Sequence, residues 1–481
     1  AKRLRDACRK AGAELVTCSD NPVDAVWADR PPVPAGRIVP HPLEHAGEPH
    51  EDKLARIAEG LEHTDVHAAV LTQPDSIAWL LNIRGSDVAH TPLPLSFAIL
   101  HAQGRLDLFI DERKLDAAAR AHLGNRVTVH APGRLREALD ELGAAKKEIL
   151  LDPASAAEWI AARLTDAGAV LKHGDDPCVL PKARKNRAEL DGMRAAHVRD
   201  GAAVTRFLAW LSRDALAGDV DEISAARRLE SLRAETGALQ DLSFDTISGS
   251  GPNGAIVHYR VTEATARPLQ SGDIYLVDSG AQYLDGTTDI TRTVAIGEPG
   301  HDDALRDVRD RFTRVLKGHI GLATARFPKG TTGSQLDVLA RHALWQAGLD
   351  FDHGTGHGVG SYLSVHEGPQ RISKMPHAVA LDPGMVISNE PGFYKTGAYG
   401  IRIENLIAVT PPAPIEGGER EMLGFETLTL APIDRTLIDP ALLSDAERAW
   451  LDAYHACVHD TLAPLLPPED VAWLEQATKP I

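Results

Sequence analysis

Acidic residues inside strand-like apolar runs are the feature that most restricts how this chain can fold. Asp278 interrupts the first apolar run of "DIYLVDSGAQYLDGTTDITRTVAIG", and Asp289 lies in the next one. Glu390 ends the run "GMVISNE", and Glu404 lies inside "IRIENL". Charged side chains rarely occupy such runs unless they are paired or bind a metal. The fold must therefore supply partners for four carboxylates.

Two simpler interpretations remain open at this point. Asp278 and Asp289 are each compatible with a turn aspartate at the end of a strand. Arg402 shares a strand face with Glu404, so these two residues could form an exposed ion pair, an arrangement that contributes little to stability. Apolar side chains flank Glu404 on both sides, however, which favours a buried strand.

The spacing of the two aspartates gives a sharper test. A two-residue turn at Asp285-Gly286 pairs Asp289 with Gln282, four residues or about 13 Å along the strand from Asp278. A shared metal site would then need a longer, asymmetric loop or a bulged strand, which the glycines of this segment permit. We expect such an irregularity, and a regular tight hairpin would argue against a shared site.

Residues 353–370, "HGTGHGVGSYLSVHEGPQ", combine three histidines with alternating glycines. His353 and His357 are four residues apart, as in helical zinc motifs, but the interspersed glycines make a helix implausible. The segment also lacks the GxGxxG spacing of a phosphate-binding loop. The glycines would let the backbone approach a crowded centre closely. For any single histidine here, a hydrogen-bonded structural role is the simpler interpretation.

Taken together, four carboxylates and one imidazole form an oxygen-rich set that suits Mn²⁺, Co²⁺ or Zn²⁺. Four negative charges balance two divalent ions. The set therefore predicts a two-metal centre, in which a bridging water would be acidified into a nucleophile at neutral pH.

The organisation of the chain indicates several domains, because 481 residues suffice for two or three. Residues 1–35 predict a helix and a strand ("RLRDACRKAGAELVTC") followed by a Pro-rich linker. Residues 36–182 alternate strands and helices, which predicts an α/β middle domain. Residues 183–433 combine a long amphipathic helix with paired strands, which predicts an α+β domain with antiparallel sheet.

The last segment, 434–481, is expected to be a helical extension. Ser444 and Glu447 form a capping box ahead of a helix with one apolar face. That face consists of Trp450, Leu451, Tyr454 and Val458. It would pack either on its own domain or on a second subunit.

Composition excludes several classes of function. The formal net charge of −17 argues against a nucleic-acid partner. The four cysteines (Cys8, Cys18, Cys178 and Cys457) show no CxxC spacing and indicate reduced cytosolic thiols. No apolar run reaches the roughly 18 residues of a membrane span, and the charged start is unlike a signal peptide. The chain is therefore expected to be cytoplasmic, without a membrane partner.

Five residues and their settings resemble the metal set of the pita-bread metallopeptidases. They are Asp278 and Asp289 in "LVDSGAQYLDGTTDITRT", His357 in "HGTGHGVG", Glu390 in "SNEPGFY" and Glu404 in "GIRIENL". The closest resemblance is to the large, cytosolic, three-domain form of aminopeptidase P, or Xaa-Pro aminopeptidase. Other stretches similar to it are "AWLLNIRGSDVAHTPLPLSFAIL", "DLSFDTISGSGPNGAIVHY" and "LSVHEGP". Residues 1–35 resemble only the end of that form's N-terminal domain, so an upstream part is expected to be missing.

This resemblance implies both a fold and an activity. The fold is an α+β pita-bread (creatinase/aminopeptidase) catalytic domain preceded by an α/β, ribonuclease H-like domain. The activity is removal of the N-terminal residue from peptides with proline in the second position, by a hydroxide that bridges two divalent metals. The family favours manganese, with cobalt or zinc as alternatives. A homodimer is expected as well, not from the resemblance but from the apolar face of the helix that follows Ser444.

The resemblance assigns roles to the five ligands. Asp289 and Glu404 would bridge the two metals, and Asp278 would bind one of them. His357 and Glu390 would bind the other. Glu390 would also take a proton from the bridging water.

It assigns further roles to five residues that are not ligands. His366 and His258 would steady the scissile carbonyl or the substrate and help to move protons. His353, Tyr394 and Arg402 would line the pocket for the proline that follows the cleaved bond.

Three alternatives stay open. A dipeptidase for Xaa-Pro dipeptides, or prolidase, shares all five ligands and would differ by a strict dipeptide preference. A creatinase-like hydrolase would lack this metal set. A non-catalytic pita-bread module that binds protein or nucleic acid would typically have lost ligands, whereas all five are present here.

Overall fold

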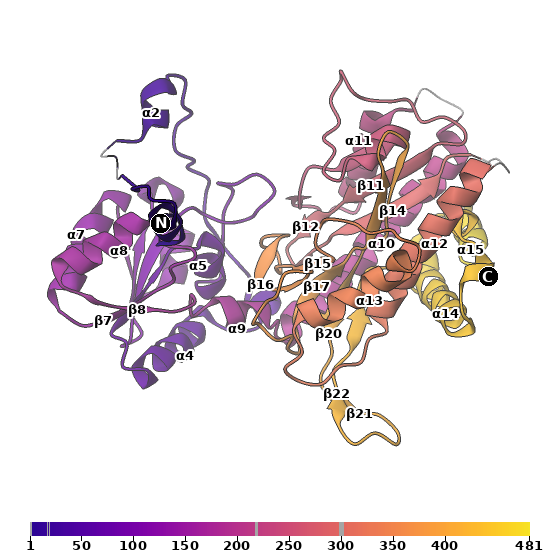
Figure 1. Cartoon of the computed structure of the whole chain (residues 1–481). Coiled ribbons are helices and arrows are strands. Elements are labelled where there is room, and N and C mark those ends of the chain that lie inside the picture. Colours follow the sequence, from indigo (N-terminus) through magenta and orange to yellow (C-terminus); the bar gives the residue numbers. More distant parts are fainter. Residues whose placement is uncertain (1, 17, 19, 217–219, 298–302) are drawn as a thin grey trace. The chain divides into compact units, whose positions relative to one another are not determined.

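The computed structural model of the chain describes residues 2–16, 18, 20–216, 220–297 and 303–481, which form two compact units (Figure 1). The first unit comprises residues 1–40, 50–88 and 93–177, and the second comprises residues 41–49, 89–92 and 178–481. None of the described helices is long and apolar enough to span a membrane. The four-part division at residues 35, 182 and 433 stays a prediction.

The first unit is built around a six-stranded mixed sheet. Its strands are β2 (Ala68–Leu71), β4 (Phe97–His101), β5 (Leu106–Phe109), β6 (Val127–His130), β7 (Glu148–Leu151) and β8 (Val170–His173). Their order is β6-β5-β4-β2-β7-β8. β4 is antiparallel to both of its neighbours, and the other pairs are parallel. The predicted α/β architecture is confirmed, including the two strands expected around residues 67–74 and 105–111.

Helices cover this sheet because their apolar residues recur at helical spacing. Leu135, Leu139 and Leu142 are buried on one face of their helix, and Ile160 and Leu164 are buried on the next one. The helices of this unit are α1 (Lys2–Lys10), α2 (Pro22–Val26), α4 (His50–His63), α5 (Pro74–Leu80), α6 (Ala117–Leu123), α7 (Leu135–Ala144) and α8 (Glu158–Ala167). A short ladder joins β1 (Val39–Pro40) to β3 (Ile83–Arg84).

The start of the chain differs in part from expectation. The predicted helix is present as α1, but the strand predicted after it is wrong for residues 13–16, which lie in no strand. These four residues are exposed, and no described strand pairs with them. Without a neighbouring strand, an apolar stretch gains nothing from an extended conformation. Residue 17 of the same stretch lies outside the described residues.

The second unit opens with the long amphipathic helix predicted from the sequence. This helix, α10 (Arg187–Asp214), begins at a capping box between Asn186 and Glu189. The other helices are α3 (Leu43–Ala46), α9 (Val179–Ala183), α11 (Glu222–Ala234), α12 (Asp303–Ala323), α13 (Gly333–Trp345), α14 (Asp445–Leu462) and α15 (Pro468–Ala477).

All named strand pairs of the second unit are antiparallel, as the sequence predicts for an α+β domain. One sheet has the order β10 (Ile247–Ser250), β11 (Ile274–Ser279), β14 (Ile290–Ala295), and a second has the order β13 (Gly286–Thr287), β12 (Ala281–Tyr283), β9 (Asp241–Leu242). The largest has the order β16 (Glu367–Ile372), β15 (Gly356–Gly358), β17 (Val386–Asn389), β20 (Asn405–Val409), β23 (Phe425–Thr427). Two further pairs join β18 (Gly392–Lys395) to β19 (Tyr399–Arg402) and β21 (Ala413–Pro414) to β22 (Glu421–Met422).

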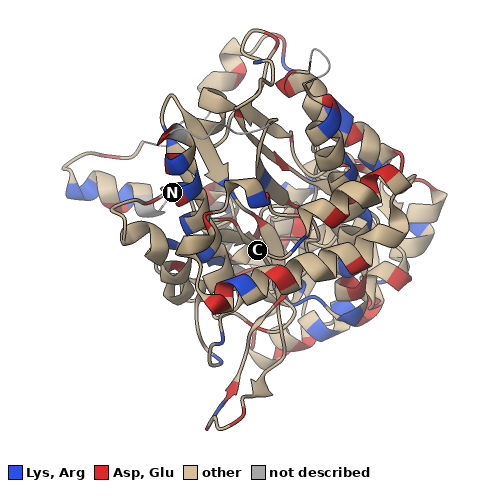
Figure 2. Ribbon diagram, turned by 90° about the vertical axis from the view of Figure 1, so that its right-hand side faces the viewer, with Lys and Arg blue, Asp and Glu red and all other residues tan. Residues whose placement is uncertain are grey.

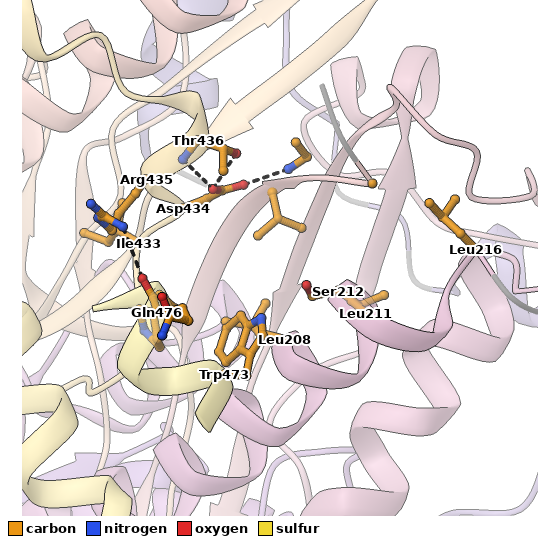
Figure 3. A pocket seen from close by; sticks show the side chains of 15 residues that line it. Leu208, Leu211, Ser212, Leu216, Ile433, Asp434, Arg435, Thr436, Trp473 and Gln476 are labelled. Carbon is orange, nitrogen blue, oxygen red and sulfur yellow. Dashed lines mark hydrogen bonds between the residues drawn. The ribbon is translucent and has the colours of Figure 1, made fainter. Parts of the chain in front are cut away.

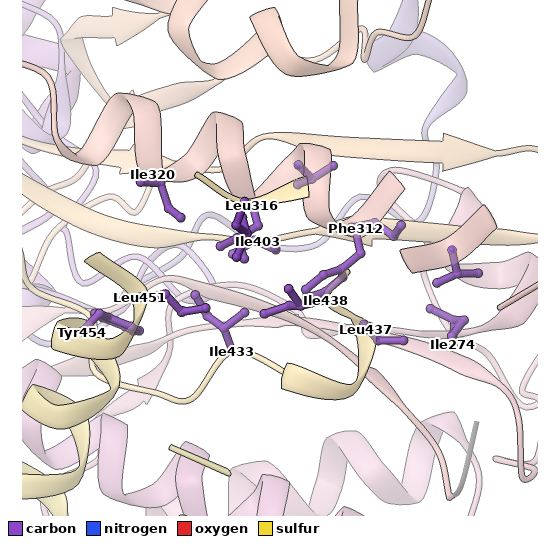
Figure 4. Close-up of a cluster of buried hydrophobic side chains, with 14 of the residues drawn as sticks. Ile274, Phe312, Leu316, Ile320, Ile403, Ile433, Leu437, Ile438, Leu451 and Tyr454 are labelled. Carbon is purple, nitrogen blue, oxygen red and sulfur yellow. The ribbon is translucent and has the colours of Figure 1, made fainter. Parts of the chain in front are cut away.

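Helix α14, which precedes the last helix α15, packs on its own unit. Its predicted capping box between Ser444 and Glu447 is present. Leu451 and Tyr454 on its apolar face join a buried cluster that also contains Phe312 of α12 (Figure 4). Of the two packing modes left open for this face, the structure shows the first, with Trp450 only partly buried.

Candidate metal centre

The hairpin that carries the two aspartates is more regular than predicted. Asp278 pairs with Thr291 in the β11–β14 ladder, and Tyr283 pairs with Gly286 in the β12–β13 ladder, in one continuous register. The two-residue turn is therefore Leu284-Asp285, so the expected turn at Asp285-Gly286 is wrong by one residue. The predicted bulge or asymmetric loop is also wrong, because the register does not shift.

The corrected turn brings the aspartates closer without a shift in register, although the ladder is interrupted at Gly280, Thr288 and Asp289, where the hairpin passes from one sheet to another. In this register Asp289 lies opposite Gly280, two residues from Asp278 and on the same face of the hairpin. Diagonal neighbours of this kind are within reach of a common centre. Residue 280 must be a glycine here, since a Cβ atom would lie 2.0 Å from the carbonyl oxygen of Thr288. A tight hairpin with an unshifted register is thus compatible with a shared site, contrary to the criterion set from the sequence.

The two glutamates meet just beyond the end of another ladder. The last pair of β17 and β20 is Asn389 with Asn405, so Glu390 and Glu404 face each other one residue further on. The backbone N–H of Glu404 donates to the carbonyl of Thr291 at 3.2 Å, which joins this ladder to the hairpin. Four carboxylates far apart in the sequence therefore converge.

His357 enters the site from β15, and the glycines around it allow close backbone approach, as predicted. A Cβ atom at Gly356 would lie 1.9 Å from the carbonyl oxygen of Ser388, and one at Gly358 would lie 2.2 Å from that of Glu367. Nδ1 of His357 donates to the Gly358 carbonyl at 2.9 Å. This hydrogen bond leaves the lone pair of Nε2 for a metal.

The ligand atoms lie within coordination range of one another. Asp289, His357 and Glu404 each offer an atom within 4.8 Å of the other two. Nε2 of His357 is 3.4 Å from Oδ2 of Asp289 and 3.7 Å from Oε1 of Glu390. Asp289 and Glu404 are 3% and 1% exposed, whereas the side chains of His357 and Glu390 are 22% and 17% exposed, so the cluster is buried on one side and accessible on the other.

Asp278 completes the set with an unsatisfied oxygen. Its Oδ2 accepts a hydrogen bond from Nη2 of Arg402 at 2.6 Å, whereas its buried Oδ1 has no hydrogen-bond partner among the described residues. Arg402 is 2% exposed and pairs with Asp278 rather than with Glu404. The interpretation of Arg402 and Glu404 as an exposed ion pair is therefore wrong.

The electrostatics of the cluster call for a cation. Burial raises the pKa of Asp289 to about 7, and the charges of Asp278 and Glu390 add to this effect. Burial also raises the pKa of Glu390, and that of Glu404 well above its ordinary value. Burial lowers the pKa of His357, but its hydrogen bond to Asp289 and the charge of Glu390 outweigh this and raise it to about 9. Without a cation, bound protons on the carboxyl groups and on His357 reduce the repulsion between the negative charges, as a metal ion would.

The donor set fits the implied metal ions. Carboxylate oxygens with a single imidazole suit hard or borderline divalent cations. The unsatisfied Oδ1 of Asp278 offers one more oxygen ligand. These residues can therefore hold divalent ions without a change in the fold.

The three residues predicted to line the proline pocket form one hydrogen-bonded chain. Nη1 of Arg402 donates to the hydroxyl of Tyr394 at 2.6 Å, and this hydroxyl lies 2.9 Å from Nε2 of His353. Nδ1 of His353 lies 2.7 Å from the Gly354 carbonyl and donates to it, so Nε2 accepts from Tyr394. Burial, with the nearby charge of Arg402, lowers the pKa of His353 to about 3, which keeps the imidazole neutral.

The two remaining histidines lie beside the ligands. The ring of His366 is 4.3 Å from that of His357, edge to face. Burial and the charge of His357 lower the pKa of His366 to about 4. His258 is exposed, and it is close enough to His353 and His366 to contribute to the lowering of both pKa values.

Sequence reasoning missed the hydroxyls that orient the ligands. Oγ of Ser388 accepts from the His357 backbone at 2.9 Å and donates to Oε1 of Glu390 at 3.0 Å. Oγ1 of Thr291 donates to Oε2 of Glu404 at 2.7 Å. Ser388 lies in β17 two residues before Glu390, so the strand period of two would have pointed to it, whereas Thr291 reaches a ligand from another segment and left no local signal.

An apolar cavity of about 520 Å³ in the second unit does not contribute to this centre. Leu208, Leu211, Ile433 and Trp473 line it, and its polar groups include Asp434 (Figure 3). None of the predicted ligands lines it.

The charges on the face shown in Figure 2 are mixed, with acidic and basic residues interspersed along the described helices.

Comparison with known proteins relates the chain to peptidases. The profile of Metallopeptidase family M24 matches residues 191–411. The Creatinase/Prolidase N-terminal domain matches residues 29–189, and the C-terminal region of peptidase M24 matches residues 421–481.

Individual relatives extend over the whole chain. It is 42% identical over 499 residues to a "Probable Xaa-Pro aminopeptidase P" of Paracoccidioides brasiliensis, covering 100% of this chain and 80% of that protein. The corresponding protein of Aspergillus flavus is 41% identical over 495 residues, at 100% and 75% coverage.

Solved structures give the same result. An X-prolyl aminopeptidase from Caenorhabditis elegans, described as a cytosolic enzyme with a di-nuclear active site, superposes with a TM-score of 0.93 at 37% identity. That match covers 100% of this chain and 78% of the other. An Xaa-Pro dipeptidase from Bacillus anthracis has a TM-score of 0.63 at 24% identity, covering 80% and 99%, and so supports the fold alone. The predicted pita-bread fold, with an N-terminal α/β domain, is confirmed.

Proposed function

The chain belongs to metallopeptidase family M24, and we propose that it removes the N-terminal residue from peptides that carry proline in the second position. The observation that carries this proposal is the convergence of Asp278, Asp289, His357, Glu390 and Glu404 in one largely buried cluster. The aminopeptidase names of full-length relatives at about 40% identity support the same activity.

The substrate explains why such an enzyme is needed. An Xaa-Pro bond is a tertiary amide without an N–H group, and the ring of proline fixes φ. A peptidase that grips its substrate like a β-strand loses a hydrogen bond at this position. Recognition must therefore come from contacts with the ring itself.

The chain of His353, Tyr394 and Arg402 supports such a ring pocket. The rings of His353 and Tyr394 are 5.5 Å apart and nearly perpendicular, which makes two walls of a corner. Because these three side chains satisfy one another, they can face an apolar pyrrolidine ring without an unpaired donor. The proline would sit against them with the scissile bond directed at the carboxylates.

The five ligands would hold two divalent ions, for which we favour manganese over cobalt or zinc. Asp289 and Glu404 would bridge them, Asp278 would bind one, and His357 and Glu390 the other. Bound there, the ions would polarise the scissile carbonyl and acidify the attacking water.

Glu390 is the proposed base. Ser388 occupies its Oε1, which leaves Oε2 to take a proton from the attacking water. This free oxygen lies at the same carboxylate that would bind a metal, so it would be close to the attacking water.

The two histidines beside the ligands would stabilise the oxyanion that develops on the scissile carbonyl and help to move protons. With its pKa lowered to about 4, His366 is neutral at pH 7 and can donate an N–H to the developing oxyanion. His258, on the exposed side, would help to hold the substrate and move protons. Acidic groups near the centre would grip the substrate's amino terminus and limit cleavage to the first residue.

The proposal includes a cytoplasmic homodimer without nucleic-acid or membrane partners. The cytosolic description of the nematode enzyme supports the location. Mass measurement by light scattering tests the dimer, and a monomer at working concentration would refute it.

Substrate length tests the function. With the metal restored, the enzyme should release arginine from Arg-Pro-Pro faster than it hydrolyses an Xaa-Pro dipeptide, because an aminopeptidase needs no free carboxylate after proline. A strict dipeptide preference would establish the prolidase alternative instead. Binding of a protein partner by a chain that hydrolyses neither substrate would establish a non-catalytic module.

A further inference from the structure

Arg292 is a buried arginine that contacts only neutral oxygens. It lies in β14 and is 1% exposed. Its nitrogens donate to the carbonyls of Pro432, Thr291, Glu404 and Ala431, to Oδ1 of Asn405 and to the hydroxyl of Tyr454, at 2.7–3.0 Å. Within the described parts of the chain it forms no ion pair with a carboxylate. Burying a charge in this way is costly, so the site must retain it for another reason.

One set of these hydrogen bonds holds the predicted ligand Glu404. Nη1 of Arg292 donates to the Glu404 carbonyl at 2.7 Å. On the opposite face of β14, the preceding residue Thr291 donates through Oγ1 to the Glu404 carboxylate at 2.7 Å. Two consecutive residues of one strand thus fix both the main chain and the side chain of Glu404, which belongs to no strand itself.

The other set belongs to the C-terminal region. Pro432, Ala431 and Tyr454 all lie in the segment that matches the C-terminal region of the family, residues 421–481. The Tyr454 hydroxyl accepts from Arg292 at 3.0 Å and lies 2.9 Å from the Ala431 carbonyl. Its ring stacks on Trp450 at 5.3 Å within the same helix, α14. The packing of α14 therefore determines where this hydroxyl lies (Figure 4).

We infer that Arg292 is a positioning residue through which the C-terminal region sets the geometry of the metal ligand Glu404. Tyr454 and the 431–432 carbonyls hold the guanidinium, and the guanidinium holds the Glu404 main chain. The C-terminal region thereby acts on metal binding, although it contributes none of the proposed ligands. This inference rests on the ligand role proposed for Glu404.

The experiment titrates metal-free protein with Mn²⁺ by calorimetry. Arg292→Lys should weaken binding by about ten- to a hundredfold, the usual effect of losing an outer hydrogen-bond partner of a ligand. Tyr454→Phe should weaken it less, because Arg292 keeps its bonds to Asn405 and Ala431. Tyr399→Phe is the matched control: this tyrosine lies in the same buried cluster, and its hydroxyl donates to Asp307 instead.

The outcomes separate the inference from the proposed function. Wild-type affinity in both test variants contradicts the inference, as does an equal loss in Tyr399→Phe. If Arg292→Lys does not fold, the comparison of Tyr454→Phe with Tyr399→Phe decides. Failure of the wild-type protein to bind Mn²⁺ at all contradicts the proposed metal centre itself and, with it, this inference.

Discussion

Replacing Ser388 by alanine tests how the ligands are held. The hydroxyl makes two hydrogen bonds, one from the His357 backbone at 2.9 Å and one to the Glu390 carboxylate at 3.0 Å, and Ser388 is 0% exposed. Without it, a buried N–H group is left unpaired, which costs about 1–3 kcal/mol of unfolding free energy. Because both partners are predicted ligands, metal affinity should also fall by about ten- to a hundredfold.

Ser248→Ala provides a matched control. Ser248 is also 0% exposed and makes two hydrogen bonds at 2.6 Å, donating to the Glu222 carbonyl and accepting from the Tyr275 hydroxyl, but it touches no predicted ligand. Both variants should lose similar stability in denaturant titrations. Only Ser388→Ala should lose metal affinity in calorimetric titration. Unchanged affinity in Ser388→Ala, or the same loss in both variants, would refute the reasoning.

Two further variants test the pocket and the first unit. Tyr394→Phe leaves Arg402 without its acceptor at 2.6 Å, so the KM for an Xaa-Pro peptide should rise with little change in metal affinity; steady-state kinetics that show an unchanged KM would exclude the pocket role. In the first unit, burial alone would raise the pKa of Asp107, but hydrogen bonds from His101 and His130 hold it at about 2, below its ordinary 3.8. Asp107 therefore stabilises the folded state above about pH 4 and loses this effect as the pH falls toward 2. Asp107→Asn should flatten the acid limb of a stability-against-pH curve, and an identical limb in the variant would contradict this account.

The proposed ligands could be chosen from the sequence because they are charged residues in runs that are otherwise apolar and expected to be buried. Asp278, Asp289 and Glu404 lie in apolar runs, and the structure buries all three. The glycines around His357 predicted close backbone contact. The structure confirms it, because a Cβ atom at Gly356 would lie 1.9 Å from the Ser388 carbonyl oxygen. Features of this kind are local in the sequence, so they can be recognised without coordinates.

Strand register was not accessible in the same way. The turn was placed at Asp285-Gly286 because Asp-Gly is a common turn pair. In the structure the turn begins one residue earlier, at Leu284. A shift of one residue in a turn moves each cross-strand partner by two residues. Asp289 therefore lies opposite Gly280 rather than Gln282, which places it two residues instead of four from Asp278.

Contacts between distant segments were also out of reach. The bond from Arg292 to Tyr454 joins residues 162 positions apart, and the pairing of Arg402 with Asp278 joins residues 124 positions apart. No periodicity marks such pairs, because they depend on how separate sheets and helices pack. The C-terminal helix shows the same limit: its apolar face was evident, but not which surface it covers.

The most direct test of the proposed reaction is the activity of Glu390→Gln on Arg-Pro-Pro after metal has been restored. Glutamine cannot take a proton from the attacking water, so arginine release should be lost while the variant stays folded. The matched control is Glu426→Gln. Glu426 lies on β23, outside the cluster, and its carboxylate pairs with Arg194 of α10, so this variant should remain active. Full activity in Glu390→Gln, or activity in protein shown to contain no metal, would contradict the account.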